Sequence, residues 1–196
     1  MNVVMLTAMA GALGRYLRAR GETRPALIQR LMVPVNMRPY QEEIRLGNEF
    51  AVILLDLPLG IADPVQRLAE VRARMDRIKG TPEVLANRLV LNVAGWLPAW
   101  VERLALRWFG RKATVAMTNV PGPERTLYLA GAPVGRVLAW VPQIAGMGIG
   151  VSVLSYAGAV TVGITTDSGV VADPWELVAG FEAELAVLAE RAFVVT

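Results

Sequence analysis

Five short segments rich in valine and isoleucine, separated from one another by glycine and proline, fill most of the chain between residues 113 and 166. β-Branched residues favour strands, and the glycines and prolines between the segments keep each strand short. The sequence therefore predicts a sheet in this part of the chain. The expected strands are residues 113–118, 126–129, 134–140, 149–155 and 160–166.

Apolar residues at helical spacing predict helices before and after these strands. The first helix has Asn2 as its expected N-cap and Gly21 as its stop signal. Asp-Pro pairs at 63–64 and 173–174 each place a proline at the first position of a helix, and the first of these helices runs to about residue 79. The stripes expected to be buried are Val3, Leu6, Ala10, Leu13 and Leu17; Val65, Leu68, Val71 and Met75; and Leu177, Phe181, Leu185 and Leu188.

Two buried strands, at 27–37 and 50–57, and two helices, at 82–90 and 98–109, complete the expected order of elements. The order of helix, strands, helices, strands and helix is typical of the α+β class. The sequence thus predicts two layers, in which a mixed β-sheet is covered by helices, within a single domain of residues 1–196.

The chain is more apolar than a typical soluble domain, with 54% hydrophobic and 19% charged residues. Some apolar surface is therefore expected to face a partner, a missing domain or lipid. The 196 residues can form one ordinary domain or one lobe of a larger two-lobed enzyme. A globular domain rarely starts on a strongly apolar helix with nothing upstream to cover its other face, so a cut through a longer fold is expected.

No histidine and no cysteine occur in the 196 residues. The usual base near neutral pH, a thiolate nucleophile and the commonest metal ligands are therefore missing, and no metal site is expected.

The net charge of +3 comes from scattered basic residues, which argues against nucleic acid as a partner. Prolines and glycines interrupt the longest uncharged stretch, residues 137–166, so no transmembrane segment is predicted. Arginines follow the first apolar stretch instead of preceding it, which argues against a secretory signal. The absence of cysteine is compatible with a reducing cytoplasm.

Residues 118–123, with the sequence Thr-Asn-Val-Pro-Gly-Pro, are the sharpest local signal of a site. A strand is expected to end at Thr118 and Asn119 and to run into a type II turn at Pro121 and Gly122. Such a turn can present backbone N–H groups and the Asn119 amide to a ligand oxygen, as oxyanion stabilisation requires. The alternative is a rigid turn in which Asn119 caps its own backbone.

Three further features each have a functional and a structural interpretation. The alternating glycines of residues 146–150 open no helix, so they mark either packing within the chain or the approach of a thin acyl or pantetheine arm. Ser152, Ser155 and Tyr156 carry hydroxyls that no histidine can activate, so a self-contained serine hydrolase is rejected. The amphipathic segment 96–112, with three tryptophans, would either lie at a membrane interface or pack on the sheet.

Short motifs along the chain resemble those of the C-terminal half of bacterial wax ester synthase/diacylglycerol acyltransferases. The sharpest are TNVPGP at 118–123, YLAG at 128–131, WVPQ at 140–143 and SYAG at 155–158. Weaker ones upstream, in the same order as in the family, are AGAL at 10–13, VPVN at 33–36 with Arg38, Gly47-Asn48 and Leu57-Pro58. The resemblance covers nearly the whole chain.

This resemblance implies a fold like that of chloramphenicol acetyltransferase and peptide-synthetase condensation domains, in which two related lobes meet at a tunnel. It also implies transfer of a fatty acyl group from acyl-CoA, the co-substrate, to a long-chain alcohol or a diacylglycerol, with no cofactor. In that family the base is the second histidine of an HHxxxDG motif on the N-terminal lobe, and these residues contain no such motif. The family also has an Asn-Asp pair at the start of the first helix, where this chain has Asn2 and Val3.

The leading hypothesis is therefore the C-terminal lobe of an acyl-CoA-dependent O-acyltransferase that makes wax esters or triacylglycerol and is nearly inactive without a histidine-bearing N-terminal lobe. A membrane or lipid-droplet surface is a candidate further partner, with a peripheral location in the cytoplasm. The alternatives are a non-catalytic lipid-binding or lipid-droplet-associated module, and a truncated reading frame without activity of its own. The candidate pocket residues are Thr118, Asn119, Pro121, Gly122, Gln143, Ser155 and Tyr156.

Overall fold

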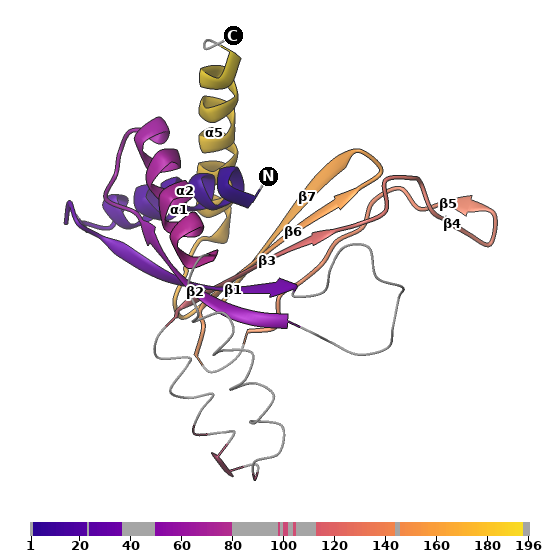
Figure 1. Ribbon diagram of the computed structural model, residues 1–196, viewed down its shortest axis with the longest axis horizontal. Coiled ribbons are helices and arrows are strands. Elements are labelled where there is room, and N and C mark those ends of the chain that lie inside the picture. The colour runs from indigo at the N-terminus through magenta and orange to yellow at the C-terminus, as the bar shows by residue number, and fades with distance from the viewer. Residues whose placement is uncertain are drawn as a thin grey trace.

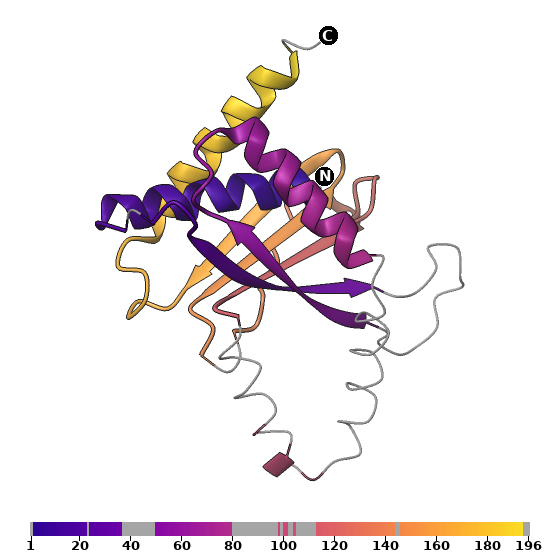
Figure 2. The same ribbon diagram turned by 60° about the vertical axis from the view of Figure 1, so that its left-hand side comes forward.

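The computed structural model of the chain describes residues 2–22, 24–36, 50–79, 98, 100, 101, 104, 113–143 and 146–193. Within these ranges, three long helices lie against one face of a five-stranded mixed sheet, which confirms the α+β prediction (Figures 1 and 2). The predicted helix at 82–90, the motif residues Arg38, Gly47 and Asn48, and all of the segment 96–112 except 98, 100, 101 and 104 lie outside the described residues.

The three helices begin and end at the residue types that the sequence indicated. They are α1 (Asn2–Ala19), α2 (Pro64–Lys79) and α5 (Pro174–Phe193). The Asp63 carboxylate caps α2 by accepting a 2.8 Å hydrogen bond from the Gln66 N–H. The Asp173 carboxylate caps α5 in the same way, and Gly21 ends α1 with a φ of 89°. None of the helices that the structure describes is both long and apolar enough to cross a membrane.

The strands of the main sheet lie in the order β2-β1-β3-β6-β7. β1 (Ile28–Asn36) pairs antiparallel with β2 (Phe50–Pro58) and parallel with β3 (Val115–Pro121). β6 (Ile149–Tyr156) pairs parallel with β3 and antiparallel with β7 (Ala159–Thr166). Two hairpins therefore flank β3, which lies at the centre of the sheet.

A second, two-stranded sheet forms a hairpin that projects past the end of the main sheet (Figure 1). Its strands are β4 (Tyr128–Leu129) and β5 (Ala132–Pro133). The predicted strand at 134–140 is wrong, because this segment has no strand partner and is irregular. It runs across a face of the sheet, where the Ser152 hydroxyl donates a hydrogen bond to the Ala139 carbonyl oxygen.

The main core lies between the helices and the sheet face that they cover. Alternate strand residues contribute to it, among them Leu31, Leu55 and Val151, which are fully buried. The opposite face of the sheet carries a smaller core. Its buried members are Ala113, Ala116, Val141 and Met147. Of the predicted helical stripes, the buried residues are Leu6, Ala10, Leu13, Val71, Met75, Leu177, Phe181 and Leu188.

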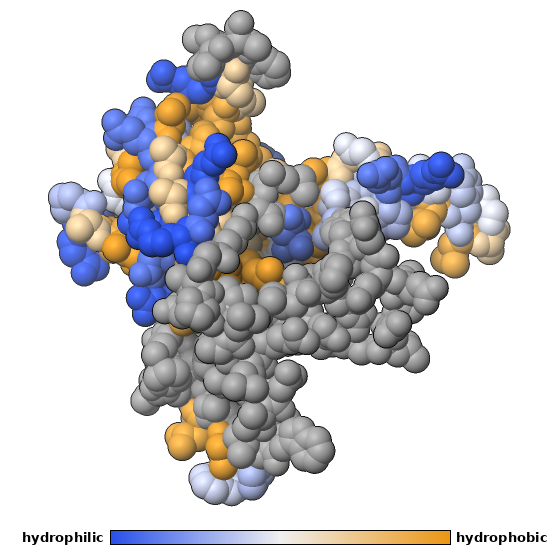
Figure 3. Space-filling model, viewed as in Figure 1, coloured by the Kyte–Doolittle hydropathy of each residue, from blue (hydrophilic) through white to orange (hydrophobic). Residues whose placement is uncertain are grey.

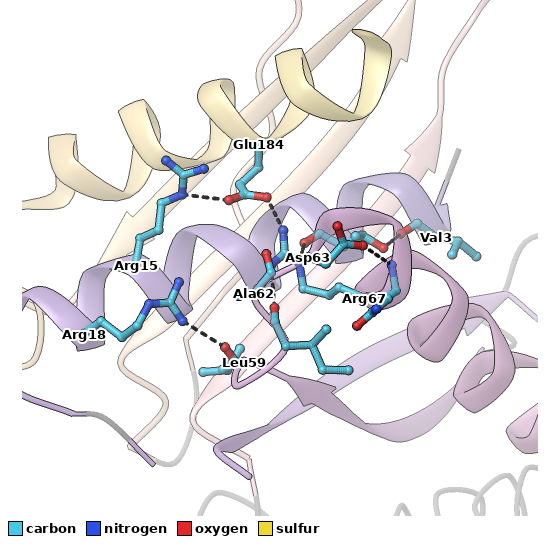
Figure 4. A network of polar contacts seen from close by, with 11 residues as sticks. Val3, Arg15, Arg18, Leu59, Ala62, Asp63, Arg67 and Glu184 are labelled. Atoms are coloured by element: carbon cyan, nitrogen blue, oxygen red, sulfur yellow. Dashed lines mark hydrogen bonds and ion pairs between the residues drawn. The ribbon is translucent and has the colours of Figure 1, made fainter. Parts of the chain in front are cut away.

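The first turn of α2 departs from the predicted stripe, because a charged side chain takes the buried position. Val65 is 48% exposed, whereas Arg67 is 1% exposed. The Arg67 guanidinium pairs with the Glu184 carboxylate of α5 (Figure 4). Arg15 of α1 donates a 2.7 Å hydrogen bond to the other oxygen of the same carboxylate. Since a buried charge is tolerated only when it is paired, this cluster ties the three helices together.

Gly11 of α1 lies beside this ion pair. A Cβ atom at this position would lie 2.6 Å from Arg67 Nη2 and would also overlap the Glu184 carboxylate. Glycine therefore lets α1 approach the charged cluster, which is a physical reason for the glycine in the motif at residues 10–13.

Candidate functional site

The motif at residues 118–123 forms the end of a strand, not a turn. β3 continues through Asn119 to Pro121, in parallel pairing with β6 that places Pro121 opposite Ser155. Gly122 does not have the positive φ that a type II turn requires of its glycine. The predicted type II turn is therefore wrong, because pairing with a strand distant in sequence outweighs the local preference of Pro-Gly.

Gly122 joins the ends of these two parallel strands. Its N–H donates a 2.9 Å hydrogen bond to the Ser155 carbonyl oxygen and lies 3.3 Å from Ser155 Oγ. A Cβ atom on Gly122 would overlap the Ser155 carbonyl oxygen. The glycine is thus explained by the close approach of β6, and its N–H is used within the protein.

Alternation along the strands assigns the other candidate residues to two faces of the sheet. Met117 of β3 and Val153 of β6 belong to the core under the helices. Asn119, Pro121 and Ser155 continue the same alternation, so they lie on the helix-covered face, towards strand ends that project past the helices (Figure 1). The Asn119 Oδ1 atom is buried.

Two candidate residues act on the opposite face as anchors. The Tyr156 hydroxyl accepts a 2.9 Å hydrogen bond from the Leu127 N–H and donates one of 2.7 Å to the Val134 carbonyl oxygen. The Gln143 amide donates a 3.0 Å hydrogen bond to the Thr165 carbonyl oxygen. These bonds hold the chain between β3 and β6 against the sheet.

The seven candidate residues therefore do not form one cluster. Asn119, Pro121 and Ser155 share the helix-covered face, Thr118, Gln143 and Tyr156 belong to the opposite face, and Gly122 fills a tight backbone contact between the strand ends. Of the seven, the polar side chains on the helix-covered face are those of Asn119 and Ser155.

Ser152 has a structural role that the sequence did not reveal. Its side chain is 2% exposed, and it faces Gly163 on β7. A Cβ atom on Gly163 would lie 2.7 Å from Ser152 Oγ and 2.9 Å from the Ala139 carbonyl oxygen. A serine opposite a glycine thus leaves room for residues 134–140, here called the crossing segment. The glycine inside a strand is the sequence signal that could have indicated this close approach.

Comparison of the sequence with known protein families gives a match. The family described as the WS/DGAT C-terminal domain matches residues 46–189. The chain belongs to this family. The probable diacylglycerol O-acyltransferase tgs1 of Mycobacterium tuberculosis (strain H37Rv) is 32% identical over 191 residues, which cover 95% of this chain and 41% of that protein. The chain therefore spans about two fifths of the length of this curated relative.

Solved structures share the fold of this WS/DGAT C-terminal domain. The wax ester synthase/diacylglycerol acyltransferase from Marinobacter aquaeolei VT8 superposes with a TM-score of 0.67 at 23% identity, covering 97% of this chain and 43% of that one. The epimerization domain from the third module of tyrocidine synthetase B superposes with a TM-score of 0.60 at 13% identity, covering 97% and 42%. These likenesses confirm the expected fold, that of one lobe of a chloramphenicol-acetyltransferase-like protein.

Two of the three glycines at 146–150 of the WS/DGAT domain are explained by packing within the chain, and Gly146 by its positive φ of 85°. A Cβ atom on Gly148 would lie 2.8 Å from Val170 Cγ1, and one on Gly150 would lie 3.3 Å from the Val141 carbonyl oxygen. The chain's own segments thus occupy the space beside both glycines, which confirms the structural interpretation for Gly148 and Gly150.

An open cleft of about 570 Å³ lies at the β2 edge of the domain, between β1, β2 and α2. Among the residues that line it, Arg30 pairs with Asp56 at 2.7 Å and Arg74 pairs with Glu70 at 2.6 Å. The hydrogen bond from Arg30 holds the pKa of Asp56 below its ordinary value, although desolvation acts in the opposite direction. The charges of this cleft are largely neutralised within the domain, and the cleft lies on strands other than those that carry Asn119.

Proposed function

We propose that this WS/DGAT C-terminal domain works as one lobe of an acyl-CoA-dependent O-acyltransferase that makes wax esters or triacylglycerol. The substrates are a fatty acyl-CoA and a long-chain alcohol or a diacylglycerol, with no further cofactor. The observation that carries the proposal is the family match over residues 46–189 in a chain that has no histidine. The catalytic base then comes from a second, histidine-bearing lobe, here called the His lobe.

The proposed reaction needs a base at the acceptor hydroxyl. The hydroxyl oxygen attacks the thioester carbonyl carbon, and its proton passes to a histidine of the His lobe. The bond between carbon and sulfur then breaks and the proton passes to the sulfur, so the products are an ester and free CoA. Between these steps, negative charge on the former carbonyl oxygen must be stabilised by polar groups of the pocket.

Asn119 is the residue of this domain that we propose for the pocket. Its neutral amide can donate a hydrogen bond to a developing negative charge. It lies on the helix-covered face near the projecting end of β3, and the Ser155 hydroxyl follows on the neighbouring strand. Gly122 and Tyr156 would act indirectly, because their hydrogen bonds hold the strand ends and the crossing segment in place.

The test places Asn119→Ala in a complete enzyme, here called the fused enzyme, in which this chain replaces the matched C-terminal part of tgs1. We expect turnover with a fatty acyl-CoA and diacylglycerol to fall about 100-fold, because one polar donor is lost. The unfolding temperature should change by less than about 3 °C. Thr118→Val, on the opposite face of the same strand, is the control and should keep its turnover. Equal losses in both variants, or a parallel loss of folding, would contradict a pocket role for Asn119.

A second candidate function is non-catalytic binding to a lipid surface. It is favoured by large apolar side chains that remain in contact with water, among them Leu129 and Trp175 at 75% exposure and Trp140 at 70%. Co-sedimentation with anionic vesicles tests it. Chain found in the pellet would support lipid binding, and chain that stays in the supernatant would count against it.

A further inference from the structure

The open cleft at the β2 edge, here called the edge cleft, has apolar walls that are only partly covered. Its apolar residues are Ile28 of β1, Leu54 and Leu55 of β2, and Ile78 of α2. Ile28 is 50% exposed, and Leu54 and Ile78 are half-buried. A concave space of about 570 Å³ with apolar walls and a few polar groups is of the kind that takes a small molecule.

The charged residues of the edge cleft leave one positive charge without a counter-charge. They are Arg30, Asp56, Glu70, Arg74 and Arg77. The Arg30 guanidinium donates two hydrogen bonds to the Asp56 carboxylate, at 2.7 and 3.1 Å. Arg74 donates one of 2.6 Å to the Glu70 carboxylate, whereas the exposed guanidinium of Arg77 pairs with none of the residues that the structure describes. Three arginines against two carboxylates give a surplus of one positive charge.

The surplus charge lies next to apolar side chains. Arg74, Arg77 and Ile78 follow one another at helical spacing, so they share the face of α2 that borders the edge cleft. Hydrophilic residues gather over α2 (Figure 3), and Ile28 and Leu54 line the cleft from the strands. A guanidinium can bind a carboxylate by two parallel hydrogen bonds, and apolar side chains shield an alkyl chain from water. The edge cleft therefore offers both kinds of contact to one molecule.

We propose that the edge cleft binds a long-chain fatty acid in its ionised form. The carboxylate carries a single negative charge, which matches the surplus, and binds Arg77, while the alkyl chain covers Ile28 and Leu54. A phosphate group carries up to about two negative charges and a neutral lipid carries none, so both match the surplus less well. The inference goes beyond the proposed function, because the edge cleft lies on β1, β2 and α2, away from the strand that carries Asn119, and the fatty acid is bound there without being converted.

Calorimetric titration of the 196-residue chain with decanoate, decanol and acetate tests the proposal. We expect decanoate to bind at one site and the other two probes to bind at least about tenfold more weakly, because decanol lacks the charge and acetate lacks the chain. Decanoate binding should also weaken as the salt concentration rises. Equal binding of decanoate and decanol would overturn the proposal, since the charge would then play no part.

Three variants of α2 test the charge. Arg77→Gln removes the surplus and should weaken decanoate binding about tenfold. Arg72→Gln is the matched control, because Arg72 is an exposed arginine of the same helix that does not line the edge cleft, and its affinity should stay within about twofold of wild type. Glu70→Gln raises the surplus to two charges and should strengthen binding about threefold. Equal affinities in all three variants would overturn the contact between the carboxylate and Arg77.

A second pair of variants tests the apolar wall. Ile28→Asn places a polar group where the alkyl chain is expected and should weaken decanoate binding about fivefold. Val65→Asn is the matched control, since Val65 has a similar exposure of 48% on the first turn of α2 and does not line the edge cleft. Equal affinities in these two variants would show that the chain does not lie against Ile28, and the proposal would fail.

Asn119→Ala separates the edge cleft from the proposed reaction pocket. We expect this variant to bind decanoate with wild-type affinity, and a loss of affinity would overturn the edge cleft as the site. Decanoate binding that depends on Arg77, in a fused enzyme that forms no ester, would support the edge cleft and count against the proposed function. Ester formation without such binding would do the reverse. Phosphatidylglycerol vesicles that sediment the wild-type chain but not Arg77→Gln would also overturn the proposal, in favour of a membrane headgroup.

Discussion

Glu184 joins three helices through one buried carboxylate. It is 3% exposed and accepts hydrogen bonds from Arg15 and Arg67. Arg67 also donates to the backbone oxygens of Thr7 at 3.2 Å and Ile61 at 2.8 Å. Desolvation lowers the pKa of Arg67 from its ordinary value, and the charge of Glu184 opposes this effect. The cluster is therefore stable while all of its charges are paired, and removal of any one member would leave a buried charge without a partner and lower the stability of the fold.

Glu184→Gln keeps the shape of the side chain and removes its charge. We expect a loss of roughly 3 kcal/mol in the free energy of unfolding, because Arg67 is left buried without a counter-charge. Urea unfolding followed by circular dichroism measures it. Glu182→Gln, an exposed position on the same helix, is the control and should change stability by less than about 0.5 kcal/mol. Similar small losses in both variants would contradict the account of the cluster.

Asp56 makes the stability of the β1–β2 hairpin depend on pH. The hydrogen bond from Arg30 holds the pKa of the folded Asp56 below that of the unfolded chain. The stabilisation is therefore complete above a pH of about 4 to 5 and is lost as the pH falls through the lower, folded-state pKa. Because the pair is partly exposed, Asp56→Asn should lower the free energy of unfolding by only about 0.5 kcal/mol at pH 7. The difference from wild type should vanish near the acid limit of the unfolding titration, and a constant difference would contradict an ionic origin.

The role of a single residue was predictable from the sequence where that role depends on its immediate neighbours in the chain. Asp63 and Asp173 cap helices, as their Asp-Pro pairs indicate. Arg67 was not predictable, because helical spacing marks apolar positions and its partner Glu184 lies 117 residues further along the chain.

At the scale of elements, local preference located the strands of the sheet but misjudged how some of them end. The Pro-Gly pair at 121–122 favours a turn, yet β3 continues through Pro121 because it pairs with β6. The valine-containing segment 134–140 was expected to be a strand, but side chains of β6 bind its carbonyl groups instead. Asn119 was recognisable as a candidate, whereas its separation from Thr118 onto another face follows because β3 continues through both residues and successive side chains of a strand alternate.

Tyr156→Phe tests whether one hydroxyl fixes the base of the β4–β5 hairpin. The substitution removes the bonds to Leu127 and Val134 and keeps the buried ring. We expect a loss of about 1 kcal/mol, because two partly buried backbone groups lose a partner, together with faster amide exchange at Leu127. Ser155→Ala is the control, since its hydroxyl only supplements the bond from Gly122 to the Ser155 carbonyl oxygen, and it should leave the Leu127 exchange rate unchanged. Unchanged exchange in Tyr156→Phe would contradict the anchoring role.

At the scale of the whole molecule, one layer of helices covers part of a sheet, and the strand ends and the β4–β5 hairpin extend past this layer (Figure 1). The order of elements was enough to predict this layered α+β architecture, because each apolar face must find a partner layer. The extent to which the strand ends would project past the helices was not predictable, because it depends on the pairing of β3 with β6, two segments that are distant in the sequence. The central claim is that this WS/DGAT C-terminal domain forms one side of a reaction site and that the proton acceptor belongs to the His lobe.

Ester formation by the purified 196-residue chain tests this claim most directly. The chain and the fused enzyme would each be incubated with palmitoyl-CoA and either hexadecanol or a diacylglycerol, and the ester would be quantified by chromatography. The account predicts ester from the fused enzyme and none above the protein-free background from the chain alone. Ester formed by the chain alone at the rate of the fused enzyme would contradict it, because these 196 residues would then hold a complete catalytic site without histidine.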